Sequence, residues 1–153
     1  MNLPERIVSG GQTGADRAAL DVALLRGIPC GGWCPKGRRA EDGPIDGRYP
    51  LQETPTPDYM QRTDWNVRDS DGTLIVAHRP LSGGTAITER FAQRRGRPCL
   101  VVHPDEEDAV ARTRRWLAQH PIAVLNVAGP RESSGTASYA ATRRLLEAIL
   151  DGR

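Results

Sequence analysis

The sequence predicts an α/β protein with a Rossmann-like, doubly wound, mainly parallel sheet of about five strands and helices on both faces. Short apolar segments alternate with helix-forming segments along the whole chain, which is the pattern of successive βαβ units. Some apolar segments are nearly continuous, as in GTLIVAH at 72–78, which is typical of strands buried on both faces. The 153 residues, 1–153, suit one compact domain, and no internal repeat or domain boundary interrupts them.

The first half of the chain begins with a strand at 6–11 (RIVSGG) that ends in glycines, followed by a helix at 15–27. Gly27 takes the position that a helix C-cap prefers. A weaker second strand follows at 29–35 (PCGGWCP). The segment 35–57 is rich in proline, glycine and charge, and it predicts a long loop. Loops longer than about 12–15 residues are usually functional or disordered.

The second half repeats the alternation more clearly. The helix expected at 105–120 has acidic residues in its first turn and arginines further along, an order that the helix macrodipole favours. The expected elements are a short helix in 58–71, a strand at 72–78, a helix at 85–96, a strand at 97–103, the helix at 105–120, a strand at 122–129 and a closing helix at 134–150. A parallel sheet follows because each strand is separated from the next by a helix.

Composition excludes several function classes. The formal net charge of +2 is too small to indicate nucleic-acid binding from bulk electrostatics. No apolar stretch approaches the roughly 20 residues that span a bilayer, so no membrane association is expected. The first residues, MNLPERIV, lack the apolar core of a signal peptide, and a cytoplasmic location is the expectation.

Cysteines and histidines give no metal signature. Cys30, Cys34 and Cys99 are odd in number and contain no CxxC spacing, which disfavours both a disulfide scaffold and a zinc site. The three histidines, His78, His103 and His120, stand far from the cysteines and from one another in sequence. They are interpreted as surface residues, and no metal site is predicted.

Three glycine-bearing turns follow strands and precede helices. They are SGGQTG at 9–14, HRPLSGGTAITE at 78–89 and NVAGPRESSGT at 126–136. In an open α/β sheet the ligand binds at the carboxyl ends of the strands, where these turns lie. A helix N-terminus offers unpaired N–H groups and a positive dipole end, so it holds an anion without a charged side chain.

The named phosphate-binding motifs are absent from the first turn. A Walker A loop needs Lys-Ser/Thr after its last glycine, whereas Gly14 is followed by Ala15 and Asp16. Asp16 is expected beyond the anion, as an acid that stabilises the helix dipole. A dinucleotide fingerprint needs a glycine where Ser9 stands and an acid after the second strand, which ends at Lys36. Both P-loop NTPase activity and conventional NAD binding are disfavoured.

The candidate ligand-binding residues lie at these turns, at the end of the second strand or on the long loop. They are Gly10, Gly11, Gln12, Thr13, Gly14, Trp33, Lys36, Arg38, Glu41, Asp42, Gly83, Gly84, Thr85, Gly129, Arg131 and Ser133. Each has a structural alternative: glycines permit tight packing, Thr13 and Ser133 are suitable helix caps, and Trp33 either stacks on a base or packs against the core.

The charged loop residues also leave two interpretations open. Lys36 and Arg38 either neutralise a phosphate or form a solvated surface. Glu41 and Asp42 either pair with those cations, bind a ribose hydroxyl, hold a divalent metal beside the phosphate, or are simply solvated.

Five segments together resemble the SLOG superfamily, a Rossmann-like group that includes the phosphoribohydrolases once called lysine decarboxylases. They are SGGQTGADRAALDVA, GGWCPKGRRAEDGPI, NVRDSDGTLIV, GGTAITE and LNVAGPRES. The chain is most similar to a circularly permuted branch labelled "putative molybdenum carrier". The resemblance covers nearly the whole chain, and it implies a nucleotide-like ligand across the glycine turns and a homodimer or higher homo-oligomer.

The resemblance also supplies one candidate catalytic residue. In the phosphoribohydrolases a PGGxGTxxE motif provides phosphate-binding amides and a catalytic glutamate, and the matching stretch here is 81–89. Glu89 takes the place of that glutamate but falls one position early relative to Gly83, and one residue is about 100° around a helix. The remaining carboxylates near the turns, Glu41, Asp42 and Asp16, are alternative acids.

Three functions follow from these features. The first is a sensor or binding protein for a nucleotide or another small phosphorylated ligand. The second is a nucleoside-monophosphate phosphoribohydrolase, which hydrolyses a ribosyl N-glycosidic bond. The third, implied by the resemblance, is a carrier of the molybdenum cofactor.

Overall fold

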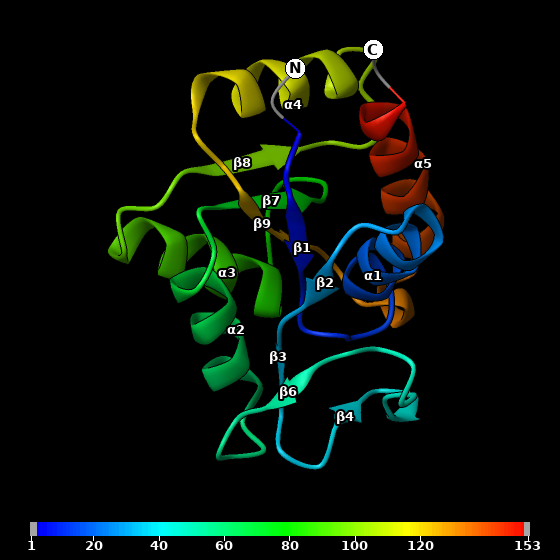
Figure 1. Ribbon diagram of the computed structural model, residues 1–153, viewed down its shortest axis with the longest axis vertical. Helices are drawn as coiled ribbons and strands as arrows, with labels where there is room; N and C mark the ends of the chain where they lie inside the picture. Colours follow the sequence, from blue (N-terminus) through cyan, green and yellow to red (C-terminus); the bar gives the residue numbers. More distant parts are fainter. Residues whose placement is uncertain (1–2, 152–153) are drawn as a thin grey trace.

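The computed structural model describes residues 3–151 and has at its centre a five-stranded parallel sheet with the strand order β2-β1-β9-β7-β8 (Figure 1). The strands of this sheet are β1 (Arg6–Val8), β2 (Cys30–Gly31), β7 (Gly72–Val76), β8 (Cys99–Val102) and β9 (Val124–Ala128). All four pairings are parallel, because the chain crosses over by way of a helix or long segment between successive strands. The predicted fold class is confirmed.

Helices cover both faces of the sheet. They are α1 (Ala15–Arg26), α2 (Tyr59–Arg68), α3 (Gly83–Arg94), α4 (Ala109–Gln119) and α5 (Ser138–Leu150), with a short 3-10 turn η1 at Glu132–Ser134. The helices α1, α4 and α5 share one apolar core with the sheet, and α1 packs along α5. On the other face α2 packs against α3, which contacts β7 and β8.

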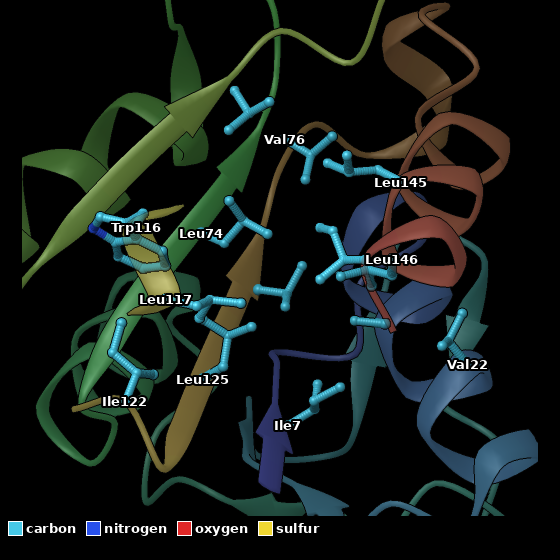
Figure 2. Close-up of a cluster of buried hydrophobic side chains, with 14 of the residues drawn as sticks. Ile7, Val22, Leu74, Val76, Trp116, Leu117, Ile122, Leu125, Leu145 and Leu146 are labelled. Atoms are coloured by element: carbon cyan, nitrogen blue, oxygen red, sulfur yellow. The ribbon is translucent and has the colours of Figure 1, made fainter. Parts of the chain in front are cut away.

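The core lies between the sheet and the helices α1, α4 and α5. Figure 2 shows Leu74 and Val76 of β7 pointing toward Leu145 and Leu146 of α5, and all four side chains are buried. Alternate residues of one buried strand therefore face these helices, while the residues between them face α2 and α3. Burial on both faces explains why the sequence of β7 is nearly all apolar, with Thr73 the one polar residue in it.

Element boundaries differ from the predicted ones where a local feature ends the regular structure. The predicted second strand is divided into β2 and β3 (Trp33–Cys34) by Gly32, whose φ is 126°. The helix α4 begins only at Ala109, and the acids before it form turns. Gly27 ends α1 in the left-handed conformation, with φ 68°, as predicted.

The segment 35–57 is not the structureless loop that its composition predicts. It holds β4 (Arg39–Ala40), which pairs with β5 (Gly43–Pro44), and β6 (Gln52–Glu53), which pairs with β3. Ile45 and Tyr49 are buried in a second apolar cluster with Leu20 of α1. The segment is therefore held in place against the rest of the domain, and it lies below the sheet in Figure 1.

The strand order creates a switch point in the middle of the sheet. From β1 the chain proceeds to β2 on one side, and from β7 it proceeds to β8 on the other. The strand β9 lies between β1 and β7, so the turns after these three strands meet at one edge. This is the place where an open α/β sheet binds its ligand. Among residues 3–151 no helix is long and apolar enough to cross a bilayer.

Gly14 and Gly27 flank α1, and replacing each by alanine should lower the stability by different amounts. Gly14, with φ 83°, would place a Cβ atom 2.3 Å from the Pro130 carbonyl oxygen, whereas a Cβ at Gly27 would meet nothing within 4 Å. We expect Gly27→Ala to lower the free energy of unfolding by about 1 kcal/mol. Gly14→Ala should cost about 3 kcal/mol or more, since strain and a backbone clash add.

Urea denaturation of the two variants measures this difference, and Gly27→Ala is the matched control for the positive φ angle alone. Equal losses for the two variants would contradict the close approach of the α1 N-terminus to Pro130.

Candidate functional site

A cavity of about 660 Å³ opens at the carboxyl ends of β1, β9 and β7. Its volume lies within the range of small-molecule sites, roughly 300–1,000 Å³. The turn after β7 and the turn after β9 form much of its wall, and α2 closes a further part. The lining residues are Gly10, Gln12, Asp16, Arg62, Thr63, Asn66, 77–85, Thr88, 126–131, Ser133, Ser134 and Thr136.

The three glycine turns of the sequence meet at this cavity. Eight of the candidate residues line it: Gly10, Gln12, Gly83, Gly84, Thr85, Gly129, Arg131 and Ser133. Gly129 permits the convergence, because a Cβ there would lie 2.6 Å from the Val76 carbonyl oxygen and 2.7 Å from Cβ of Ala15. The three turns meet at the cavity, but they differ in how many of their main-chain N–H groups already have a hydrogen-bond acceptor within the chain.

The first turn closes on the carboxylate of Asp16, which is 8% exposed. The Gln12 N–H donates to Asp16 Oδ2 at 3.3 Å, and the Gly10 N–H also stabilises the charge. Burial raises the pKa of Asp16 to about 6, and nearby Arg62 and these N–H groups offset only part of that effect. Asp16 lies in the first turn of α1, as expected, and its carboxylate also accepts hydrogen bonds from the N–H groups of the turn before the helix.

The third turn is also occupied by a carboxylate of the chain itself. Glu41, on the β4–β5 hairpin, accepts the Ser133 N–H at 3.1 Å and hydroxyl hydrogen bonds from Ser133 and Thr13. The hydrogen bond from Ser133 and then that from Thr13 lower the pKa of Glu41. The Thr13 Oγ1 in turn accepts the Glu132 N–H at 3.1 Å. These contacts tie the hairpin to the turn after β9.

Among residues 3–151 no carboxylate accepts a main-chain hydrogen bond from the second turn. This turn begins α3, and the N-cap residue Ser82 makes no side-chain capping bond. The first N–H groups of a helix have no partner within the helix. Gly83 and Gly84 are exposed, Thr85 is buried, and all three line the cavity. The N-terminus of α3 therefore differs from the other two turns in that no carboxylate of the described chain occupies its donors.

Arginines give the cavity a positive wall. Arg62 is 7% exposed and donates from Nη1 to the Gly10 carbonyl oxygen at 2.8 Å, while Arg79 and Arg131 also line the cavity. Asp16 is the only carboxylate among the described lining residues. Sequence reasoning missed Arg62. Its available signal was weak: Arg62 and Asn66 stand one helical turn apart, and both are buried although α2 is short and polar.

Gln12 contributes an unused donor. Its Oε1 accepts the Thr13 N–H at 3.0 Å and the Glu41 N–H at 2.8 Å. Its Nε2 is buried and has no hydrogen-bond partner among the described residues. A buried amide without a partner costs free energy, which suggests a ligand acceptor at this position.

The other candidate residues do not line the cavity. Trp33 packs edge-on against Trp65, and its Nε1 donates to Asp69 at 2.8 Å, so the structure favours the packing interpretation over base stacking. Arg38 donates to four carbonyl oxygens of residues 45–51 and so stabilises the long segment. The remaining residues outside the lining are Gly11, Thr13, Gly14, Lys36, Glu41 and Asp42, and Asp42 pairs with Arg17 at 2.7 Å.

Glu89 also lies outside this cavity. It forms an ion pair with Arg79 at 2.6 Å and lines a separate hollow on the outer side of α3, with Pro80, Leu81 and Arg90. Arg79 borders both spaces. Glu89 falls one position early in the sequence motif, and in the structure its carboxylate lies on the side of α3 that faces away from the cavity. This geometry gives no support to the candidate catalytic role of Glu89.

The raised pKa of Asp16 predicts a specific pH dependence of stability. The ordinary pKa of an aspartate is 3.8 and that of Asp16 in the folded protein is about 6, so the folded state holds the proton more tightly and loses stability as the pH rises between these values. This difference in pKa corresponds to about 3 kcal/mol. We expect the free energy of unfolding of Asp16→Asn, relative to wild type, to increase by about that amount from about pH 4 to about pH 7.

Urea denaturation at several pH values measures the change. Asp42→Asn is a matched control, because the hydrogen bond from Arg17 lowers the pKa of Asp42 and the sign of its pH dependence is opposite. If the difference in free energy of unfolding between Asp16→Asn and wild type did not change with pH, the pKa of Asp16 would not be raised in the folded state.

A solved structure and a family model resemble this chain over nearly its whole length. A crystal structure of a putative molybdenum carrier protein from Syntrophus aciditrophicus SB is 53% identical to the chain, with a TM-score of 0.93. The match covers 96% of this chain and 95% of that one. None of the curated proteins matches. A family model matches residues 7–150, which confirms the resemblance to SLOG proteins: the chain belongs to the circularly permutated YpsA SLOG family.

Proposed function

We propose that the chain binds a nucleotide or a nucleotide-derived phosphorylated small molecule in this cavity, as a sensor or binding protein. The observation that carries the proposal is the uncapped N-terminus of α3, with Gly83, Gly84 and Thr85 lining the cavity. Main-chain N–H groups and the helix dipole together favour an anion such as a phosphate group at this position.

The remaining lining supports an anionic ligand of nucleotide size. Three arginines, Arg62, Arg79 and Arg131, line the cavity, although Arg79 also pairs with Glu89. The one carboxylate among the described lining residues is that of Asp16, whose burial disfavours its charged form. The volume of about 660 Å³ accommodates a mononucleotide. The unpartnered Nε2 of Gln12 is available to an acceptor on the base or the sugar.

A carrier of the molybdenum cofactor is a second candidate, favoured by the 53% identical structure of a putative molybdenum carrier protein. The phosphate group of such a cargo suits the same N-terminus of α3. No cysteine stands among the described lining residues, so the cavity offers arginines and amides rather than thiolates. The cargo would be held by its organic part, and pterin fluorescence after oxidation of freshly purified protein distinguishes it from a nucleotide.

Gly84 allows a direct test of anion binding at α3. A Cβ at Gly84 meets nothing within 4 Å, and an acid in the first turn of a helix is favourable, so Gly84→Asp should fold normally. Its carboxylate would compete for the N–H groups and repel a phosphate. We expect at least about a tenfold loss of affinity for AMP, a difference of about 1.4 kcal/mol.

Thermal-shift titration with AMP and other nucleoside phosphates measures this loss, because a ligand of the folded state raises the melting temperature. Gly84→Ala controls for the added methyl group, and Gly47→Asp adds the same charge at another open glycine. No shift of wild type with any phosphorylated ligand, or unchanged binding by Gly84→Asp, would refute the proposal.

The enzymatic alternative makes a separate prediction. A phosphoribohydrolase needs an acid within hydrogen-bond reach of the ribosyl bond, and Asp16 is the only described carboxylate that lines the cavity. Because Asp16 is bound to turn amides, we expect AMP to remain intact, as measured by chromatography of free base. If wild type releases free base from AMP and Asp16→Asn does not, the protein is an enzyme that uses Asp16. If the release is lost in Glu89→Ala, the position assigned to Glu89 outside the cavity is contradicted.

A further inference from the structure

Two histidines that are distant in sequence lie together beside the cavity. His78 follows β7 and His103 follows β8, and these neighbouring parallel strands pair Val76 with Val102. The carboxyl ends of the strands therefore bring the imidazoles into contact, with ring centroids 3.8 Å apart and planes at 88°. The two histidines, expected at the surface, are half-buried and in contact with each other.

A carboxylate completes the group. Asp105 lies two residues after His103, and its Oδ2 is 3.8 Å from His78 Nε2. One ligand atom from each of the three residues can be chosen so that all lie within 4.8 Å of one another. Ligand atoms of one tetrahedral zinc ion lie about 3.4 Å apart, so small side-chain movements that separate the two imidazoles and bring Asp105 closer would place all three on one ion.

We propose that His78, His103 and Asp105 bind one divalent transition-metal ion, of which Zn²⁺ is the representative. Two imidazoles with one carboxylate are a donor set that suits zinc and its neighbours, and three protein ligands leave a coordination position open. His78 also lines the cavity, next to the turn that leads into α3. The open position is thus accessible to water or to an anionic group from the cavity.

The hydrogen bonds of the metal-free group show what must change on binding. His103 Nδ1 accepts the Asp105 N–H at 3.2 Å, so the His103 proton is on Nε2, which donates to His78 Nδ1. A metal at His103 Nε2 takes the place of that proton, and the neutral ring then carries its proton on Nδ1. The hydrogen bond from the Asp105 N–H is then lost, and Asp105 lies in the exposed residues 105–108, which can move with its side chain.

The third histidine provides the matched control. His120 follows α4 beside Trp116, which packs near Gly72 at the amino end of β7, whereas His78 and His103 follow the carboxyl ends of β7 and β8. Its replacement therefore removes a histidine without touching the group. The variants are His78→Gln, His103→Gln and His120→Gln of the full chain. Each is freed of metal with a chelator, and its melting temperature without metal confirms that it folds.

Calorimetric titration with ZnCl2 alone, in phosphate-free buffer, tests the site. Wild type and His120→Gln should bind one ion per chain, and His78→Gln and His103→Gln should each weaken binding by on the order of 100-fold. The absorption spectrum of the Co²⁺-substituted wild type should show bands typical of nitrogen and oxygen ligands and no thiolate charge-transfer bands. This measurement uses wild type alone, so it does not depend on whether a variant folds.

Three outcomes would overturn the proposal: no binding by wild type, binding that survives both His78→Gln and His103→Gln, or thiolate bands that assign the ion to a cysteine. Because the probe is the metal alone, failure here leaves the binding of phosphorylated ligands a separate question, and failure of nucleotide binding leaves the metal site standing.

Discussion

The proposed ligand site depends on which main-chain N–H groups the chain's own carboxylates leave free at the sheet edge. Three glycine turns converge there. Two of them bind carboxylates of the chain: Asp16 accepts a hydrogen bond from the turn after β1, and Glu41 reaches the turn after β9 from the β4–β5 hairpin. Among the described residues no carboxylate accepts from the N-terminus of α3, and we therefore propose it as the position of an external anion.

The two internal carboxylates have different consequences. Glu41 is exposed, and its hydrogen bonds connect segments that are far apart in sequence, which fixes the hairpin beside the cavity. Asp16 is buried, and its raised pKa means that the charged form costs stability at neutral pH. A cost of this kind at a cavity wall is typical of functional sites, because folding alone would favour an uncharged residue. Arg62, which donates to the Gly10 carbonyl oxygen, reduces that cost by its positive charge.

Much of the fold was predictable from the sequence, because strand and helix periodicity are local properties. The strand-ending glycines also located the edge at which a ligand would bind. Contacts between distant segments were not predictable: the pairing of Glu41 with Ser133, the approach of Arg62 to Gly10, and the meeting of His78 with His103 all depend on strand order. Composition was misleading for residues 35–57, where short strands and two buried side chains, Ile45 and Tyr49, order a segment rich in proline and glycine.

The most direct test of this account is a nitrogen–proton NMR titration of the full chain with AMP. Hydrogen bonding to a phosphate shifts an amide proton strongly downfield. The account predicts that the largest shifts belong to the amides of Gly83, Gly84 and Thr85, while those of Gln12 and Ser133, already bound to Asp16 and Glu41, change little. The reverse pattern, with Gly10 to Thr13 shifting most and the α3 amides unchanged, would contradict it.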